Sequence, residues 1–108
     1  DVSPEGMASV VLTKEVLERF QATDQLASLV VSVPGTVEGI LAWSMYVEQE
    51  DGTFRVHLRS KGPTVNHIAQ AFGGGGHTLA CGIPSVTKSQ ILEVDAELKE
   101  AVKAFKKN

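Results

Sequence analysis

Four consecutive glycines followed by a histidine, residues 73–77, are the part of this sequence best suited to binding chemistry. Glycine permits positive φ angles and lets another group approach the main chain closely. Consecutive backbone N–H groups without side chains can form a concave site for phosphate, and a neighbouring histidine adds a further donor. A flexible connector is the alternative for an isolated glycine run. Because this run lies between two apolar segments, we predict that substrate is bound by Gly73, Gly74, Gly75, Gly76 and His77.

A second candidate site lies upstream, at the end of a segment that alternates strictly between apolar and polar residues, 54–60. This pattern predicts a strand with one apolar face and with Arg55, His57 and Arg59 on the other. Arg59 stands at the end of the strand, where a guanidinium group can direct two N–H groups at one phosphate. We predict that Arg59 and the Ser60 hydroxyl bind substrate, and we interpret Arg55 and His57 as a solvated face.

The other reactive side chains do not suggest a catalytic or metal site. His67 is expected to face solvent on a helix, and Cys81 to be a small packed residue. The three histidines are spread over a predicted strand, helix and loop without a clustered carboxylate, so we predict no metal site. No Asp or Glu occurs between Gly52 and Leu92, which leaves no general base there. We therefore expect no catalytic residue, and a chain that holds a ligand without cleaving it.

The composition fits one globular domain with a local anion site. Of the 108 residues 43% are hydrophobic and 21% are charged, which is ordinary for such a domain. The net charge of −3 argues against non-specific nucleic-acid binding, but the acid-free middle is cationic. No segment is long enough to span a membrane, and the single cysteine fits a cytoplasmic protein. The sequence starts without Met, and we interpret it as a piece of a longer chain.

The elements that must position these residues can be predicted from periodicity and capping signals. We expect strands near 6–12, 40–50, 54–60 and 80–86, with an Asp-Gly hairpin turn between the second and third. We expect helices over 14–20, 22–31, 64–72 and 88–105, with Thr13 capping the first and a Thr87–Gln90 capping box opening the last. These elements predict an α/β fold: a single domain with a mixed sheet of about five strands and helices packed against it.

The segment 74–82, GGGHTLACG, resembles the GGGHxxAxG signature of the DHHA1 domain, the C-terminal substrate-binding domain of DHH-family phosphoesterases. Residues 55–62 and 65–77 fall where this family carries RVSxRSKG and VNxIAxxFGGGGH. The resemblance implies that residues 1–108 are a DHHA1-like domain. It also implies that Gly74, Gly75, Gly76 and His77 grip a phosphate or sugar edge, while Arg59 and Ser60 hold a second phosphate or the base end. His57 departs from the family, which usually has a small residue there.

Within the family, the pattern is most similar to the branch that hydrolyses short oligoribonucleotides and 3′-phosphoadenosine 5′-phosphate. The cyclic-dinucleotide phosphodiesterases and single-strand DNA exonucleases remain alternatives, and so does a non-catalytic RNA-binding appendage of a synthetase-like protein. The resemblance implies manganese-dependent hydrolysis, with the metal held by an N-terminal DHH domain that this sequence lacks. The chain alone should therefore be inactive and bind no cofactor. Its expected partners are short single-stranded RNA or nucleotide phosphates and the DHH domain.

Overall fold

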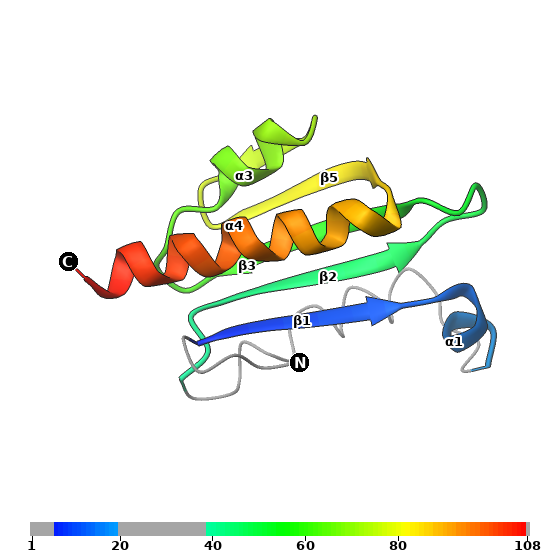
Figure 1. The fold of residues 1–108 in the computed structure, drawn as a ribbon, viewed down its shortest axis with the longest axis horizontal. Helices are drawn as coiled ribbons and strands as arrows, with labels where there is room; N and C mark the ends of the chain where they lie inside the picture. The colour runs from blue at the N-terminus through cyan, green and yellow to red at the C-terminus, as the bar shows by residue number, and fades with distance from the viewer. Residues whose placement is uncertain (1–5, 20–38, 108) are drawn as a thin grey trace.

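The computed structural model describes residues 6–19 and 39–107, which form one five-stranded sheet with helices (Figure 1). The strands are β1 (Met7–Leu12), β2 (Ala42–Glu48), β3 (Phe54–Ser60), β4 (Gly75–His77) and β5 (Ala80–Val86). The helices are α1 (Lys14–Arg19), α3 (Asn66–Ala71) and α4 (Lys88–Lys106). The strand order is β1-β2-β3-β5-β4, with β1 parallel to β2 and the other neighbours antiparallel. The predicted α/β fold with a mixed sheet is confirmed.

Helices α3 and α4 pack against the same face of the sheet, here called the helix face (Figure 1). Alternate side chains of the strands meet the apolar stripe of α4, in which Val94, Leu98 and Val102 are buried. The predicted capping box is present, since Thr87 Oγ1 accepts from Gln90 N and Gln90 Oε1 accepts from Thr87 N. The helix predicted over 88–105 is therefore confirmed, both in where it starts and in which face is apolar.

A polar cluster joins α4 to the sheet on the helix face. The Asp95 carboxylate accepts three hydroxyl hydrogen bonds, from Ser9 at 2.8 Å, Ser44 at 2.8 Å and Tyr46 at 2.5 Å. Burial is the main cause that raises the pKa of Tyr46 above its usual range, and the nearby charge of Asp95 raises it further. The Tyr46 hydroxyl therefore keeps its proton and remains a donor. These three bonds fix the position of α4 over β1 and β2 where apolar packing alone would permit sliding.

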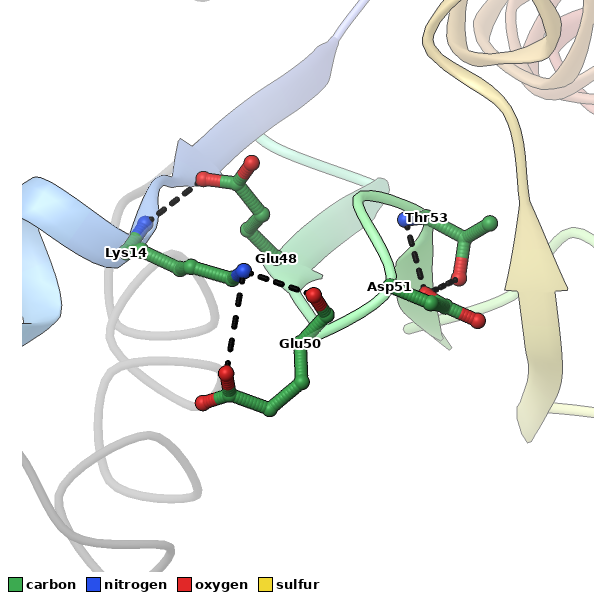
Figure 2. A network of polar contacts seen from close by, with 5 residues as sticks. All are labelled: Lys14, Glu48, Glu50, Asp51 and Thr53. Atoms are coloured by element: carbon green, nitrogen blue, oxygen red, sulfur yellow. Dashed lines mark hydrogen bonds and ion pairs between the residues drawn. The ribbon is translucent and has the colours of Figure 1, made fainter.

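The turn between β2 and β3 is held by its own polar side chains (Figure 2). Gly52 has a φ of 87°, as the predicted Asp-Gly turn requires. The Asp51 carboxylate accepts from the Thr53 backbone N–H at 3.0 Å and from its hydroxyl at 2.6 Å, and these bonds lower the pKa of Asp51. Lys14 Nζ donates to the Glu50 carbonyl at 2.8 Å and so ties the start of α1 to this turn.

The opposite face of the sheet, here called the outer face, differs from one edge to the other. On β1 and β2 it is apolar, and Ala8, Trp43 and Met45 are buried there. On β3 the outward residues are Arg55, His57 and Arg59. The helix predicted over 22–31 lies outside the described residues. None of the helices in the described part of the chain is long and apolar enough to cross a membrane.

Candidate functional site

Strand β3 forms as predicted and separates its side chains cleanly between the two faces. Phe54, Val56 and Leu58 are buried on the helix face. Arg55 is exposed on the outer face, whereas His57 and Arg59 are half-buried there. Because cross-strand partners point to the same face, the register of the sheet decides which residues surround these three cationic or titratable groups.

The register places glycine and alanine beside β3 on the outer face. His57 is opposite Gly82 of β5, which is opposite Gly75 of β4. In the neighbouring row, Arg59 is opposite Ala80, which is opposite His77. The outer face beyond β3 therefore has a floor of small residues, with Arg59 on one side and His77 on the other. Two strand spacings, or about 10 Å, separate the α-carbons of Arg59 and His77.

The sequence predicted a loop over the whole glycine run. In the structure, Gly75–His77 instead form strand β4. Gly73 and Gly74 instead end helix α3. Gly73, with a φ of 90°, donates to the Gln70 carbonyl at 3.2 Å, and Gly74 donates to the Ala69 carbonyl at 2.7 Å. This pair of bonds is a Schellman cap. The N–H groups of Gly73 and Gly74 are thus engaged within the chain, and a nest of all four glycine amides is not formed.

Close contact with β5 gives a second reason for the glycines. A Cβ atom at Gly74 would lie 2.1 Å from the Gly82 carbonyl oxygen, and one at Gly76 would lie 2.8 Å from the Cys81 α-carbon. Gly76 also has a φ of 137°. At Gly75, by contrast, an added Cβ would meet nothing within 4 Å. Packing therefore accounts for Gly74 and Gly76, whereas Gly75 leaves open space on the outer face.

Arg59 is held in place by backbone carbonyls. Its Nη1 donates to Leu58 O at 2.9 Å and to Cys81 O at 3.3 Å, so the guanidinium extends toward β5. A guanidinium has five N–H donors, and those on Nη2 and Nε meet no acceptor among residues 6–19 and 39–107. Arg59 is therefore a preoriented cation with donors left for an anion.

Ser60 does not converge with Arg59, although the sequence predicted that the two act together. Successive strand residues point to opposite faces, and Ser60 is paired with Ala42, whose side chain is on the helix face. The Ser60 hydroxyl donates to the Pro63 carbonyl at 2.5 Å and accepts from Gly62 N at 3.1 Å. Ser60 holds the turn that follows β3, and its binding of substrate stays a prediction.

His77 is exposed at the edge of the sheet, and its ring orientation is set by one local bond. Its Nδ1 accepts from the Leu79 backbone N–H at 3.3 Å. In the neutral ring the proton is then on Nε2, which makes that nitrogen a donor to a ligand on the outer face. Arg59 and His77 are thus brought onto one face by the register, as their predicted roles require.

The remaining titratable groups have simpler environments. Burial, followed by the charges of Arg59 and Arg55, lowers the pKa of His57, so its ring is neutral near pH 7. Cys81 is buried on the helix face, and burial raises the pKa of its thiol. It is the packed residue that the sequence predicted, and His67 is exposed as predicted. No cluster of His, Cys, Asp or Glu suited to a metal occurs within the described ranges, so these residues do not fit manganese.

Hollows on the surface differ in charge. A pocket of about 220 Å³ on the outer face is lined by residues 55–57 and 82–84, with no carboxylate. A hollow of about 420 Å³ beside α4 includes Glu97 and Glu100, and a mainly apolar one of about 740 Å³ includes Glu48. Of these three hollows, which are lined by described residues, the one of about 220 Å³ is therefore best matched to an anion. The sequence did not single it out, because strand pairing that brings Pro84 beside Arg55 is not encoded locally.

Comparison with known proteins agrees with the fold and the motif. The family model described as the DHHA1 domain matches residues 7–106. A Bacillus subtilis protein named "Bifunctional oligoribonuclease and PAP phosphatase NrnA" is 39% identical over 102 residues, which are 94% of this chain and 32% of that protein. A Streptococcus mutans protein named "Probable bifunctional oligoribonuclease and PAP phosphatase NrnA" is 37% identical over 103 residues, 95% of this chain and 33% of the relative.

A solved structure has the same fold. The crystal structure of an exopolyphosphatase-related protein from Bacteroides fragilis superposes with a TM-score of 0.77 at 24% identity, covering 98% of this chain and 31% of that one. This likeness concerns the fold alone. The chain spans about a third of the length of the curated relatives that it matches.

Proposed function

The chain belongs to the DHHA1 domain family, and from this premise we propose that it is the substrate-binding domain of a longer phosphoesterase that hydrolyses short oligoribonucleotides or 3′-phosphoadenosine 5′-phosphate. The curated relatives are named as hydrolases of this kind. The observation that carries the proposal is the row on the outer face in which Arg59 and His77 flank Ala80. This row offers two kinds of donor to one anion.

The proposed binding mode follows from the donors that remain available. Arg59 directs its Nη2 and Nε groups at a phosphate, while its Nη1 stays on two carbonyls. His77 donates from Nε2 to the same phosphate or to a ribose oxygen. Gly75 lets the ligand approach the backbone, whereas Gly73 and Gly74 support it by ending α3 and Gly76 by its close packing on β5. Direct contacts of Gly73, Gly74 and Gly76 with the ligand remain part of the prediction. Ser60 acts on Arg59 by fixing the turn behind it, and a direct contact of its hydroxyl remains part of the prediction.

The hydrolytic chemistry belongs, in this proposal, to a part of the protein outside this chain. Manganese bound by Asp and His residues of a DHH domain would supply an activated hydroxide. The described residues contribute no such ligand cluster, and their role is to bind and orient the phosphate. The same proposal includes single-stranded RNA as a ligand, the DHH domain as a partner and a cytoplasmic location.

An NMR titration of the chain with 3′-phosphoadenosine 5′-phosphate and with a short RNA tests this function. We expect amide shifts concentrated at residues 73–78 and at Arg59. Arg59→Ala and His77→Ala should each weaken binding by about ten- to a hundredfold, since one charge-assisted hydrogen bond contributes about 1.5–3 kcal/mol. Lys88→Ala, which removes a charge from the start of α4, is the matched control and should bind normally. Normal binding by the Arg59 and His77 variants would refute the assignment.

A further inference from the structure

The pocket on the outer face lies at the end of β3 that is remote from Arg59, where β5 bulges. Phe54 is opposite Val86 and Val56 is opposite Ile83, so Pro84 and Ser85 of β5 both face Arg55. Gln49 Nε2 donates to the Pro84 carbonyl at 2.9 Å and to Thr53 Oγ1 at 3.2 Å, which fixes the bulge to the turn after β2. The bulge that lines the pocket is therefore anchored to the turn after β2.

The lining of this pocket suits a nucleotide unit. Arg55 supplies an exposed guanidinium, His57 a half-buried aromatic ring and Pro84 an exposed apolar ring. Gly82 contributes no side chain, so the floor is open. Histidine rings are among the platforms on which proteins stack single-stranded bases. The pocket volume of about 220 Å³ is below the ~300 Å³ at which sites for whole small ligands begin, so it fits one base and not a complete dinucleotide.

Charge supports the same ligand. The His57 ring is neutral near pH 7, because burial and the adjacent arginines lower its pKa. A neutral ring stacks on a base without competing for the phosphate, which is left to Arg55. Residues 53–91 contain no Asp or Glu. The cations of β3 are thus not neutralised from within this segment.

Distance along β3 indicates how the pocket relates to the row of Arg59, Ala80 and His77, here called the phosphate row. Residues four positions apart on a strand have α-carbons about 13 Å apart, and the Arg59 guanidinium is held toward β5 by Leu58 O and Cys81 O, so Arg55 and Arg59 are placed to hold different phosphates. We propose that the pocket binds the second nucleotide of a single-stranded oligonucleotide, with its base between His57 and Pro84 and its phosphate on Arg55, while the first nucleotide occupies the row of Arg59 and His77. This inference rests on the proposed function and adds that the outer face distinguishes a dinucleotide from a mononucleotide.

Calorimetry with two adenine ligands tests the proposal. One ligand is adenosine 5′-monophosphate, a single nucleotide with one phosphate, and the other is the 5′-phosphorylated diadenosine dinucleotide, which has a second phosphate and a second base. We expect His57→Ala and Arg55→Ala each to weaken binding of the dinucleotide by about tenfold. The loss of one stacked base or of one charge-assisted hydrogen bond lowers affinity by about that factor. Binding of the single nucleotide should change by less than about twofold. Arg59→Ala should weaken both ligands, and Lys88→Ala neither.

The outcomes separate this inference from the function on which it rests. If the His57 and Arg55 variants weaken both ligands equally, or neither, the second-nucleotide site is refuted while the phosphate row stands. If the native chain binds neither ligand, both the proposed function and this site are refuted for this domain. Arg55 is exposed, so Arg55→Ala should fold even if His57→Ala does not. Loss of selectivity in Arg55→Ala alone then supports the Arg55 contact.

Discussion

The two faces of the sheet use polar side chains in opposite ways. On the helix face, Ser9, Ser44 and Tyr46 all donate to Asp95, so each polar group has a partner within the chain. On the outer face, Arg59 keeps only one of its terminal nitrogens on the backbone, and His77 is exposed and uses only its Nδ1 in a bond within the described chain. The first arrangement stabilises the fold, and the second leaves hydrogen-bonding capacity for a ligand. Substitutions on the two faces should therefore change different measured quantities.

The glycine run should display this difference most strongly, because adjacent glycines serve different purposes. A Cβ at Gly74 would lie 2.1 Å from a backbone oxygen of β5, which cannot move aside cheaply. We expect Gly74→Ala to lower the free energy of unfolding by about 3 kcal/mol or more. Gly75→Ala, with open space at its Cβ, should change it by less than about 0.5 kcal/mol.

Urea denaturation of both variants measures these stabilities, and a ligand titration of Gly75→Ala completes the comparison. The added methyl group lies on the small-residue floor, so binding should weaken although the fold is kept. Equal stability of the two variants would show that β4 does not pack against β5 as described. Normal binding by Gly75→Ala would remove Gly75 from the site.

The Asp95 cluster should give the next largest effect, and only on stability. Asp95→Ala leaves three hydroxyl groups on the helix face without their acceptor, and we expect a loss of about 2–3 kcal/mol. Asp95→Asn keeps an acceptor oxygen and should cost less. Thermal unfolding measures the loss, and nucleotide affinity of the folded fraction should match that of the native chain. A change in affinity would mean that the two faces are coupled through β2 and β3.

Ser60 offers a smaller test at the boundary between the faces. Its hydroxyl holds the turn after β3 through Pro63 and Gly62, so Ser60→Ala should lower the free energy of unfolding by about 1 kcal/mol. If its role is confined to the turn, affinity for 3′-phosphoadenosine 5′-phosphate should change by less than about threefold, as one weakened positioning contact allows. A tenfold loss of affinity, measured by calorimetry, would instead establish the direct contact that the sequence predicted.

Local sequence signals account for most of the fold, and they name Arg59 and His77 as candidate site residues whose roles stay a prediction. The alternation over 54–60 predicts β3 to the residue, and the Thr87–Gln90 capping box predicts the start of α4. Strand β4 was predicted as a loop because glycine has low strand propensity and only pairing with β5 makes it a strand. The separation of Ser60 from Arg59 follows from the alternation itself. The pocket at the β5 bulge depends on register, which no local pattern in residues 80–86 specifies.

The smallest predicted effect is a pH dependence that belongs to the outer face alone. Burial and the charges of Arg59 and Arg55 lower the pKa of His57 in the folded protein, while its neighbours across the strands, Met45 and Gly82, are uncharged. In the unfolded chain the ring binds a proton at about pH 6.5. Between that value and the lower folded pKa, the unfolded state holds more protons, so stability falls as the pH is lowered and levels off below the folded pKa.

Urea midpoints at about pH 7.5 and about pH 5.5 should therefore differ more in the native chain than in His57→Ser. His67 and His77 are present in both proteins, so the difference between the two pH responses isolates His57. A bound oligonucleotide should enlarge the native pH response if its base covers the ring, because stacking then adds to burial in favouring the neutral ring and lowers its folded pKa further. An identical pH response in the native chain and in His57→Ser would mean that His57 is solvated like Arg55, and the contrast between the two faces would then rest on Arg59 and His77.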